Sequence, residues 1–528
     1  MNKKLLLGAE AVAVAAIDAG ISGVYAYPGT PSTEITTYIQ NSAEAREKNI
    51  HSRWSANEKT AYEAALGMSY SGKRALICMK HVGLNVAADA FINSAITGCN
   101  GGMVLLVADD PSMHSSQNEQ DTRMYGKFAY LPLLEPSNQQ ELYDAVKYAF
   151  DFSEKISLPI IVRVTTRLSH SRAVVVQSDK RPQNALNPST QENSWILLPA
   201  NARKNYANLL EKQTQLLEES EQSFLNKSIQ GSGNIGVIAF GIAYNYAMEI
   251  KTTHALDCGV LKISHYPLPL KTIEAFVKNY KTIVIAEEGY PIYEELLPAY
   301  FPHTTFVGRL TGALPRMGEL NPKLLGESLG ITLPVHHASS DIVVPRPPQL
   351  CQGCGHRDLF EELNHILEKY EHKHVFSDIG CYTLGALPPF NTISTCVDMG
   401  ASITMAKGAA DAGLHPAICV IGDSTFTHSG MTGLLDAVND ESNITIIISD
   451  NSTTAMTGGQ DSSGTGKLYD ICKGIGVQPE HIHLVVPIKK NREHNIRILS
   501  QEIEYKGVSV IISQRECVQV AIRNQKKS

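Results

Sequence analysis

The stretch AICVIGDSTFTHSGMTGLLDAVNDESNITIIISDN, residues 417–451, decides the fold prediction for the C-terminal part of the chain. Its ends, AICVI (417–421) and ITIIIS (444–449), are short, uninterrupted and rich in β-branched residues, as is typical of buried parallel strands. The segment between them has apolar residues at helical spacing. The stretch therefore predicts a strand–helix–strand unit. It places Asp423 and Asn451 at the carboxyl ends of strands, where open α/β sheets bind ligands.

These two residues suggest a magnesium–diphosphate site. Mg²⁺ takes a few oxygen ligands from protein and completes its shell with phosphate oxygens. Small residues nearby would let backbone amides approach a diphosphate, and a helix expected to begin near Ser429 would offer its N-terminal dipole. The alternative is that Asp423 only caps that helix. The segment TTAMTGGQ (453–460) after the second strand favours the ligand site. The small residues are Gly422, Ser424, Gly430, Gly433 and Thr457–Gly459.

Length and composition describe a soluble, multidomain protein. The 528 residues suggest two to four domains, with 43% hydrophobic and 19% charged residues. The net charge of -7 gives no sign of a nucleic-acid surface. No run of 18 apolar residues predicts a membrane span. The N-terminal run imitates a signal peptide, but Glu10 interrupts it, so we expect a first domain helix and a cytoplasmic location.

Five segments are expected along the chain. Two of them are linkers, because they are polar or proline-rich, and three alternate helical patterns with short apolar runs, which is an α/β pattern. The segments are an α/β domain at 1–190, a polar linker and solvated helix at 191–232, a smaller α/β domain at 233–335, a proline-rich linker at 336–350 and a third α/β domain at 351–528.

Further motifs occur in a fixed order around the Gly-Asp-Ser and Asn pattern. They are YPGTPSTEI (27–35), WSANEKTA (54–61), MKHVGLNVAADA (79–90), DDPSMHSSQNEQDTR (109–123), CQGCGHR (351–357), DIGCYTLG (378–385) and DMGAS (398–402). With them the chain resembles, over nearly its whole length, the thiamine diphosphate-dependent 2-oxoacid:ferredoxin oxidoreductases. The closest resemblance is to α subunits of the indolepyruvate branch.

The resemblance implies three domains. Residues 1–190 would be the pyrimidine-binding fold and residues 351–528 the diphosphate-binding fold, both doubly wound parallel sheets. The middle region resembles the transketolase C-terminal domain.

The resemblance also implies site residues. Asp423 and Asn451 match the Mg²⁺ side-chain ligands, and Thr453 matches a backbone-carbonyl ligand. Glu58 matches the acid that hydrogen-bonds the aminopyrimidine ring, where a carboxyl favours the tautomer that removes the thiazolium proton. An exposed helical glutamate is the alternative for Glu58. The full set of matching cofactor residues is Gly400, Gly422, Asp423, Ser424, Asn451, Thr453, Thr457 and Cys381.

Three residues match positions near the substrate. Thr30 matches the threonine of the family's Tyr-Pro-x-Thr-Pro turn. Arg123 would clamp a carboxylate, since guanidinium binds carboxylate bidentately, although a surface arginine is the alternative. His81, which follows a strand, would touch cofactor or substrate.

Electron transfer to ferredoxin would need an iron–sulfur cluster, and four cysteines match its ligands. They are Cys351, Cys354, Cys381 and Cys517. Zinc is the alternative for the first pair, but no second Cys-x-x-Cys pair supports it. A buried small residue is the alternative for Cys517. The other six cysteines are expected to be core thiols.

The expected activity converts an aryl 2-oxoacid, CoA and oxidised ferredoxin to an aryl-acetyl-CoA, CO₂ and reduced ferredoxin. The cofactors would be thiamine diphosphate, Mg²⁺ and one 4Fe–4S cluster, and a small β subunit would complete an α₂β₂ assembly. Family α subunits end in a ferredoxin-like domain, and the chain to Ser528 has no such cysteine runs. We therefore expect a separate electron relay or direct transfer from the cluster. A non-oxidative thiamine-dependent decarboxylase or carboligase is the main alternative, and a non-catalytic scaffold subunit is a weaker one.

Overall fold

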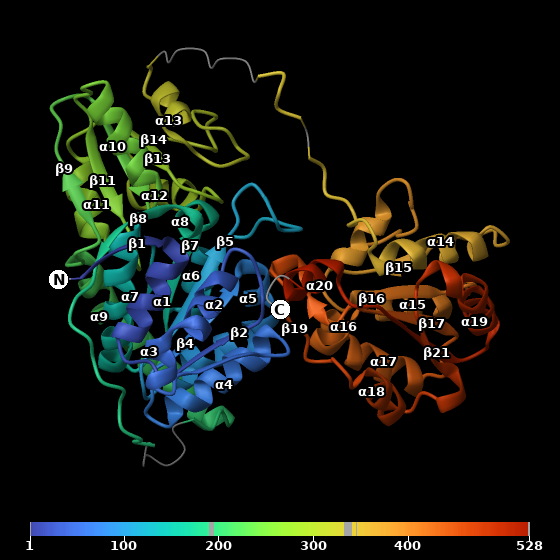
Figure 1. The fold of residues 1–528 in the computed structure, drawn as a ribbon. Coiled ribbons are helices and arrows are strands. Elements are labelled where there is room, and N and C mark those ends of the chain that lie inside the picture. The colour runs from blue at the N-terminus through green and yellow to red at the C-terminus, as the bar shows by residue number, and fades with distance from the viewer. Residues whose placement is uncertain (1, 189–194, 332–339, 345, 526–528) are drawn as a thin grey trace. The chain divides into compact units, whose positions relative to one another are not determined.

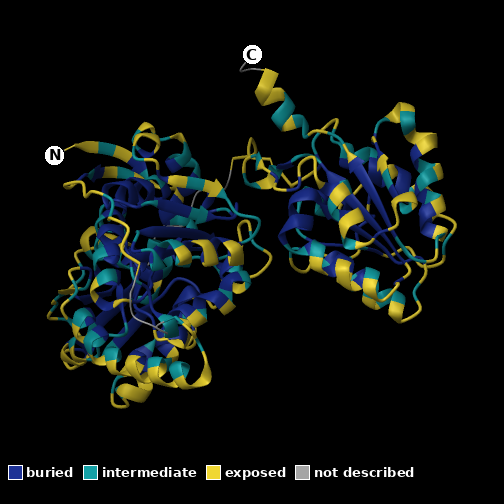
Figure 2. Cartoon of the chain, turned by 90° about the horizontal axis from the view of Figure 1, so that it is seen from below, coloured by how far each residue is buried: buried dark blue, intermediate teal, exposed yellow. Residues whose placement is uncertain are grey.

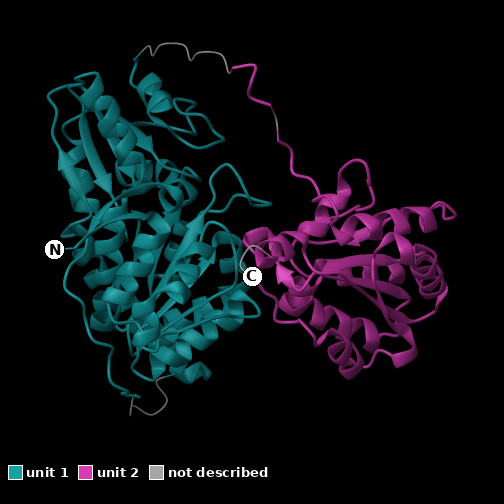
Figure 3. Ribbon diagram, viewed as in Figure 1, with its two compact units in different colours: residues 1–337 teal, residues 338–528 magenta. Residues whose placement is uncertain are grey.

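The computed structural model describes residues 2–188, 195–331, 340–344 and 346–525 (Figure 1). The chain forms two compact units, residues 1–337 and 338–528 (Figure 3). Both units are built from helices around parallel sheets, so the predicted α/β class is confirmed. The linker expected at 336–350 lies partly outside the described residues.

A seven-stranded sheet forms the centre of the first unit. Its order is β12-β6-β7-β5-β4-β2-β3, parallel throughout except that β12 pairs antiparallel with β6. Strands β4 and β5 are buried at every position, as the apolar runs predict. The strands are β2 (Gly23–Ala26), β3 (His51–Trp54), β4 (Ala75–Lys80), β5 (Met103–Asp109), β6 (Leu133–Leu134), β7 (Ile160–Thr165) and β12 (His265–Tyr266).

Helices cover this sheet, so its central strands are buried, whereas the edge strand β3 and the outer helix faces are partly exposed (Figure 2). The apolar N-terminal run forms the buried helix α1 (Gly8–Asp18), as predicted, and the strand before it, β1 (Lys3–Leu7), pairs with β8 (Arg172–Val176). The other helices are α2 (Thr33–Asn41), α3 (Ala43–Glu47), α4 (Glu58–Tyr70), α5 (His81–Thr97), α6 (Thr122–Ala129), α7 (Gln139–Ile156) and α8 (Thr166–His170).

The middle region adds a five-stranded sheet of order β14-β13-β10-β11-β9. It also donates β12 to the edge of the seven-stranded sheet, which ties both sheets into one unit. The boundaries expected at 190, 232 and 335 remain predictions. The elements are α9 (Pro199–Glu221), β9 (Lys227–Ile229), β10 (Ile235–Phe240), α10 (Ala243–Thr253), β11 (Gly259–Ile263), α11 (Leu270–Val277), β13 (Thr282–Ala286), α12 (Ile292–Tyr300), β14 (Thr305–Val307) and α13 (Pro322–Ser328).

The second unit holds a five-stranded parallel sheet of order β15-β16-β17-β21-β20. The predicted strand–helix–strand unit is present, and β16 and β17 are adjacent and fully buried. The elements are α14 (Gly355–Leu367), β15 (Val375–Ser377), α15 (Ala401–Asp411), β16 (Ile418–Gly422), α17 (Met431–Asn439), β17 (Ile444–Asp450), β18 (Thr453–Thr454), β19 (Gln460–Asp461), α18 (Leu468–Ile475), β20 (Ile482–Val485), α19 (Arg492–Glu504), β21 (Val508–Gln514) and α20 (Val518–Gln525).

The helix expected to begin near Ser429 begins six residues earlier, so that prediction was wrong. A helical turn, α16 (Asp423–Thr425), follows β16 directly and continues through a π-helical turn, η2 (Phe426–Gly430), into α17. Gly430 permits close packing inside this helix instead of starting it, because a Cβ there would lie 2.8 Å from Cδ1 of Ile421. Among the described helices, none is long and apolar enough to cross a membrane.

Candidate cofactor and cluster sites

The seven-stranded sheet has a topological switch point at β2, which lies between β3 and β4. Ligands of open α/β sheets bind outside the carboxyl ends of strands at such a point. Thr30 follows β2 and His81 follows β4. The two loops meet, because a Cβ on Gly29 would lie 3.4 Å from Cδ of Lys80. Thr30 and His81 are therefore positioned at the edge of the sheet where a ligand is expected.

Glu58 lies in the same region as the first residue of α4, which Asn57 caps by accepting a hydrogen bond from the Thr60 amide at 2.9 Å. Its side chain is 5% exposed, so it is not the surface glutamate that we considered. A Cβ on Gly83 would lie 2.6 Å from its Oε1. The carboxyl group thus packs against the first turn of α5, and only glycine at 83 leaves room for it.

His81 and Lys80 support the loop that follows β5. Nε2 of His81 lies 3.1 Å from the Asn118 carbonyl, and Nδ1 is buried without a hydrogen-bond partner among the described residues. Nζ of Lys80 donates to the Ser115 carbonyl at 2.9 Å. Burial lowers the pKa of Lys80, against the opposing effect of Asp110 and Glu58. One ring nitrogen of His81 therefore remains available to a ligand.

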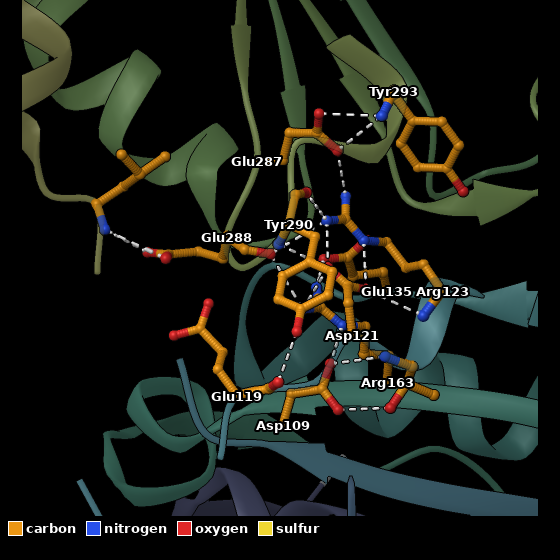
Figure 4. A network of polar contacts seen from close by, with 12 residues as sticks. Asp109, Glu119, Asp121, Arg123, Glu135, Arg163, Glu287, Glu288, Tyr290 and Tyr293 are labelled. Carbon is orange, nitrogen blue, oxygen red and sulfur yellow. Dashed lines mark hydrogen bonds and ion pairs between the residues drawn. The ribbon is translucent and has the colours of Figure 1, made fainter. Parts of the chain in front are cut away.

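The structure contradicts the prediction that Arg123 binds a substrate carboxylate. Its guanidinium is fully buried and donates to both carboxylate oxygens of Asp121 and, at 2.8 Å, to Glu287 (Figure 4). It also donates to the Glu288 and Tyr290 carbonyls. These partners leave it no access to a substrate carboxylate. Its role is structural, since it joins α6 to the loop after β13.

Arg163 makes a second set of buried polar contacts in the same network (Figure 4). Nε donates to Asp109 at 2.6 Å, Nη1 pairs with Glu135, and Nη2 donates to the Glu288 carbonyl at 3.1 Å. The carboxylates have further donors, for example the Leu320 amide at 3.0 Å from Glu288. The network is therefore a buried, well-satisfied cluster of charges between the two sheets of the first unit.

In the second unit, Asp423 has the surroundings expected of a metal ligand. It is 2% exposed, and its Oδ2 is buried with no hydrogen-bond partner among the described residues. Burial raises the pKa of Asp423 to about 7, with the nearby Ser462 hydroxyl opposing the rise and Asp450 adding to it. An unpaired buried carboxylate is costly, so a cation beside this oxygen would stabilise the site. The donor chemistry therefore fits Mg²⁺.

The other predicted magnesium ligands lie on the adjacent strand end. Gly422 pairs with Ser449 in the β16–β17 register, which brings Asn451, just past β17, to the same edge as Asp423. Oδ1 of Asn451 accepts from the Thr453 amide at 3.2 Å. Asn451 is half-buried, so it can still face a ligand.

Predicted diphosphate-binding residues border this edge. Gly400 has φ +94 and starts α15, and a Cβ there would lie 2.5 Å from Cβ of Ser429. Oγ of Ser424 lies 2.8 Å from Oγ1 of Thr454, and Thr457 donates to Gln460 at 2.6 Å. The packing leaves a backbone surface of small residues for an anion.

The four predicted cluster cysteines line one cavity of about 150 Å³. Burial raises the pKa of Cys354, with Cys351 and Cys517 adding to it, and burial likewise raises the pKa of Cys381 to about 12. Nε2 of Gln519 donates to Sγ of Cys351 at 3.4 Å. Sequence reasoning missed His356, Ser449 and Ser513, which line the same cavity, although His356 lies inside the quoted CQGCGHR motif.

The four cysteines also have the side-chain type that zinc binds, at about 2.3 Å from a single point. Within the described ranges, no three or more His, Cys, Asp or Glu side chains are grouped closely enough to hold one metal ion. Four cysteines around one cavity are the ligand set that an iron–sulfur cluster uses.

Comparisons with known proteins show which families and relatives the chain is similar to. Residues 14–208 match the family described as pyruvate flavodoxin/ferredoxin oxidoreductase, thiamine diphosphate-binding, and residues 378–511 match the C-terminal TPP-binding domain of thiamine pyrophosphate enzymes. Indolepyruvate oxidoreductase subunit IorA of Archaeoglobus fulgidus is 39% identical over 98% of this chain and 86% of that protein. Its counterpart from Methanothermobacter thermautotrophicus is 37% identical over 98% and 87%.

More distant proteins are also similar. 2-Oxoglutarate synthase subunit KorA of Archaeoglobus fulgidus is 24% identical over 54% of this chain and 88% of that protein. The solved 2-oxoglutarate:ferredoxin oxidoreductase from Magnetococcus marinus has a TM-score of 0.48 at 14% identity, over 62% of this chain and 65% of that chain.

Fold, site and family matches define a chain with thiamine diphosphate-binding domains of the 2-oxoacid oxidoreductase class. Within that class, identity over nearly the whole chain shows that it belongs to the family of indolepyruvate oxidoreductase subunit IorA.

Proposed function

We propose that this chain is the thiamine diphosphate-binding α subunit of an oxidoreductase that decarboxylates indolepyruvate or a related aryl 2-oxoacid. The products would be an aryl-acetyl-CoA, CO₂ and reduced ferredoxin. The observation that carries the proposal is the joint presence, in the second unit, of an unpaired Asp423 carboxylate oxygen and a cavity lined by four cysteines. A decarboxylase that transfers no electrons would not need the cavity.

Thiamine diphosphate, when bound, supplies the electron sink for decarboxylation. Asp423, Asn451 and the Thr453 carbonyl would hold its Mg²⁺, and the small residues around Gly400 and Gly422 would receive its diphosphate. Glu58 would hold a proton at the aminopyrimidine ring. Its burial against Gly83 supports this role, because a carboxyl group in a dry setting makes a stronger hydrogen bond than one in water.

Cys351, Cys354, Cys381 and Cys517 would bind one 4Fe–4S cluster as the path for single electrons. The thiols share a cavity in the unit that holds Asp423, and each of the four cysteines is half-buried. Solvent exposure is one determinant of cluster potential.

The substrate and a partner subunit are proposed from the relatives' names, and the other partners from the family resemblance. Thr30 and His81 would face the 2-oxoacid. The buried Arg123 would not bind the substrate carboxylate, because it is paired with Asp121 and Glu287. A small β subunit, CoA and ferredoxin would complete the enzyme, as an α₂β₂ assembly in the cytoplasm.

The test is the iron and acid-labile sulfide content of anaerobically purified full chain, with and without Cys517→Ala. We expect roughly four irons per chain. The variant should lose most of them, since a cubane with three protein ligands is labile. Cys472→Ala is the matched control, because Cys472 is a fully buried thiol on α18, outside the cavity lining. It should keep its iron.

An activity assay distinguishes the oxidative reaction from a non-oxidative decarboxylation. With its partner subunit, the protein should reduce ferredoxin only when indolepyruvate and CoA are both present. An iron-free protein that still binds thiamine diphosphate, and that releases CO₂ without an electron acceptor, would overturn the proposal in favour of a non-oxidative decarboxylase.

A further inference from the structure

A buried histidine lies among the cluster cysteines without a part in the proposed function. His356 is the second residue of α14, two positions after Cys354, and it is 3% exposed. It lines the same cavity of about 150 Å³ as the four cysteines. The cavity therefore contains an imidazole as well as thiols.

The two ring nitrogens of His356 differ. Nδ1 lies 2.7 Å from Oγ of Ser449, whereas Nε2 is buried and has no hydrogen-bond partner among the described residues. When the Ser449 hydroxyl donates to Nδ1, the neutral ring carries its own proton on Nε2. We take this tautomer for His356. A buried N–H group without an acceptor lowers the stability of the folded protein. A group bound in the cavity could supply that acceptor.

Other donors surround the same space. Ser449 on β17 pairs in register with Ser513 on β21, and the Ser513 hydroxyl is also buried without a partner in the described part of the chain. Gln519 already donates to the Cys351 sulfur at 3.4 Å. Two carboxylates also line the cavity: Asp450, which accepts from the Ser452 amide and from Gln514, and Glu516. The cavity thus offers hydrogen-bond donors to an electron-rich occupant.

The ring of His356 is held in one orientation. Tyr382 meets it edge to face, with ring centroids 6.2 Å apart and an interplanar angle of 88°. The Tyr382 hydroxyl donates to Asp378, and its ring fills the space beside Gly422. The direction of the Nε2–H bond is therefore fixed by packing.

We propose that Nε2–H of His356 donates a hydrogen bond to a sulfur atom of the iron–sulfur cluster and thereby makes its reduction potential more positive. This inference rests on the cluster of the proposed function. A donor beside sulfur stabilises the reduced cluster more than the oxidised one, because the reduced cluster carries one more negative charge. His356 is thus a positioning and tuning residue, while the cysteines bind the iron.

The experiment is an EPR-monitored redox titration of the anaerobic full chain. His356→Phe keeps the ring volume and removes the donor, so its midpoint potential should shift to more negative values than that of the wild type at equal iron content. His356→Gln keeps an N–H donor and should shift less. His265→Phe is the matched control, because His265 is equally buried but lies on β12 in the other unit. It should show no shift.

A measurement on the wild type guards against a variant that fails to load iron. Reduced protein labelled with ¹⁵N-histidine should show, by pulsed EPR, coupling to one histidine nitrogen and to an exchangeable proton. An iron-loaded His356→Phe with unchanged potential, or a wild-type cluster without this coupling, would overturn the inference and leave the cluster intact. A wild-type chain without iron would instead overturn the cluster proposal and this inference together.

Discussion

Two buried polar regions of this molecule contrast sharply. Around Arg123 and Arg163 in the first unit, each charged group has several partners at hydrogen-bond distance (Figure 4). Around the strand ends of the second unit, Asp423, His356 and Ser513 each keep one buried polar atom without a partner in the described residues. Both regions are equally dry, so exposure does not distinguish them.

The difference separates structure from function. A buried charge that already has all its hydrogen-bond and ionic partners does not require a ligand. Removing one of those partners leaves a buried charge unpaired. An unsatisfied buried group is costly in the isolated chain and becomes favourable only when a ligand completes it. The first region therefore holds the fold together, and in the second region the groups of the proposed function would supply the missing partners.

The largest expected effect would come from breaking the satisfied region. Arg163→Met should lower the free energy of unfolding by about 3 to 5 kcal/mol, because Asp109 and Glu135 would be left buried without their cation. Differential scanning calorimetry of the full chain would measure it. Lys59→Met, which removes an exposed pair with Glu63 at 3.7 Å, is the control and should change stability by less than about 1 kcal/mol. Equal effects of the two variants would contradict the contrast.

A matched pair of aspartates sharpens the comparison within the second unit. Asp378 accepts from Tyr382, Ser402 and the Gly400 amide, so Asp378→Asn should destabilise the ligand-free protein by about 1 to 3 kcal/mol. Asp423→Asn should leave it unchanged or slightly more stable, because an unpaired charge is removed.

Ligand binding should reverse that order. Asp423→Asn should weaken Mg²⁺-dependent binding of thiamine diphosphate at least about 10-fold, measured by calorimetric titration. A loss of ligand-free stability in Asp423→Asn as large as that in Asp378→Asn would show that Asp423 has a structural partner after all.

The smallest effect is a pH dependence in the first region. Burial raises the pKa of Glu288 from 4.5 to about 7. The unfolded chain therefore releases this proton at lower pH than the folded chain does, so stability falls as pH rises from 4.5 to about 7 and then levels off. Glu288→Gln should lack this fall, a difference of about 1 to 2 kcal/mol between pH 6 and pH 8. Parallel stability curves for both proteins would refute it.

The sequence was sufficient for features that depend on local pattern. The strands β16 and β17 and the position of Asp423 follow from uninterrupted apolar runs and the turn after them. The role of Arg123 could not be predicted, because its partner Glu287 lies 164 residues away in the chain. The same holds for β12, whose pairing with β6 joins segments that no local pattern connects.

Only part of the candidate site could be predicted from the sequence, because burial and contacts between distant residues are not visible in a local pattern. Motifs indicated Glu58 and the four cysteines, but residue type alone does not separate a buried glutamate from an exposed one. The cavity donors were missed because a histidine or serine becomes notable only when its burial and its lack of a partner are known. The sequence feature that could have indicated His356 is its position two residues after Cys354 in the CQGCGHR motif. Its spacing from the cysteine does not by itself assign it a role.

The π-helical turn Phe426–Gly430 is a place where the length of the segment between the two strands can change at small cost. A π-helical turn holds one residue more than an α-helical turn, so deleting one residue there would leave a regular α-helix. An α-helix turns by about 100° per residue, so a deletion within Met431–Asn439 would instead rotate the residues beyond it by that angle and move core residues such as Leu434 or Ala437 toward solvent. Natural insertions and deletions between the two strands should therefore collect in the π-helical turn and after Asn439, where the chain leaves the helix.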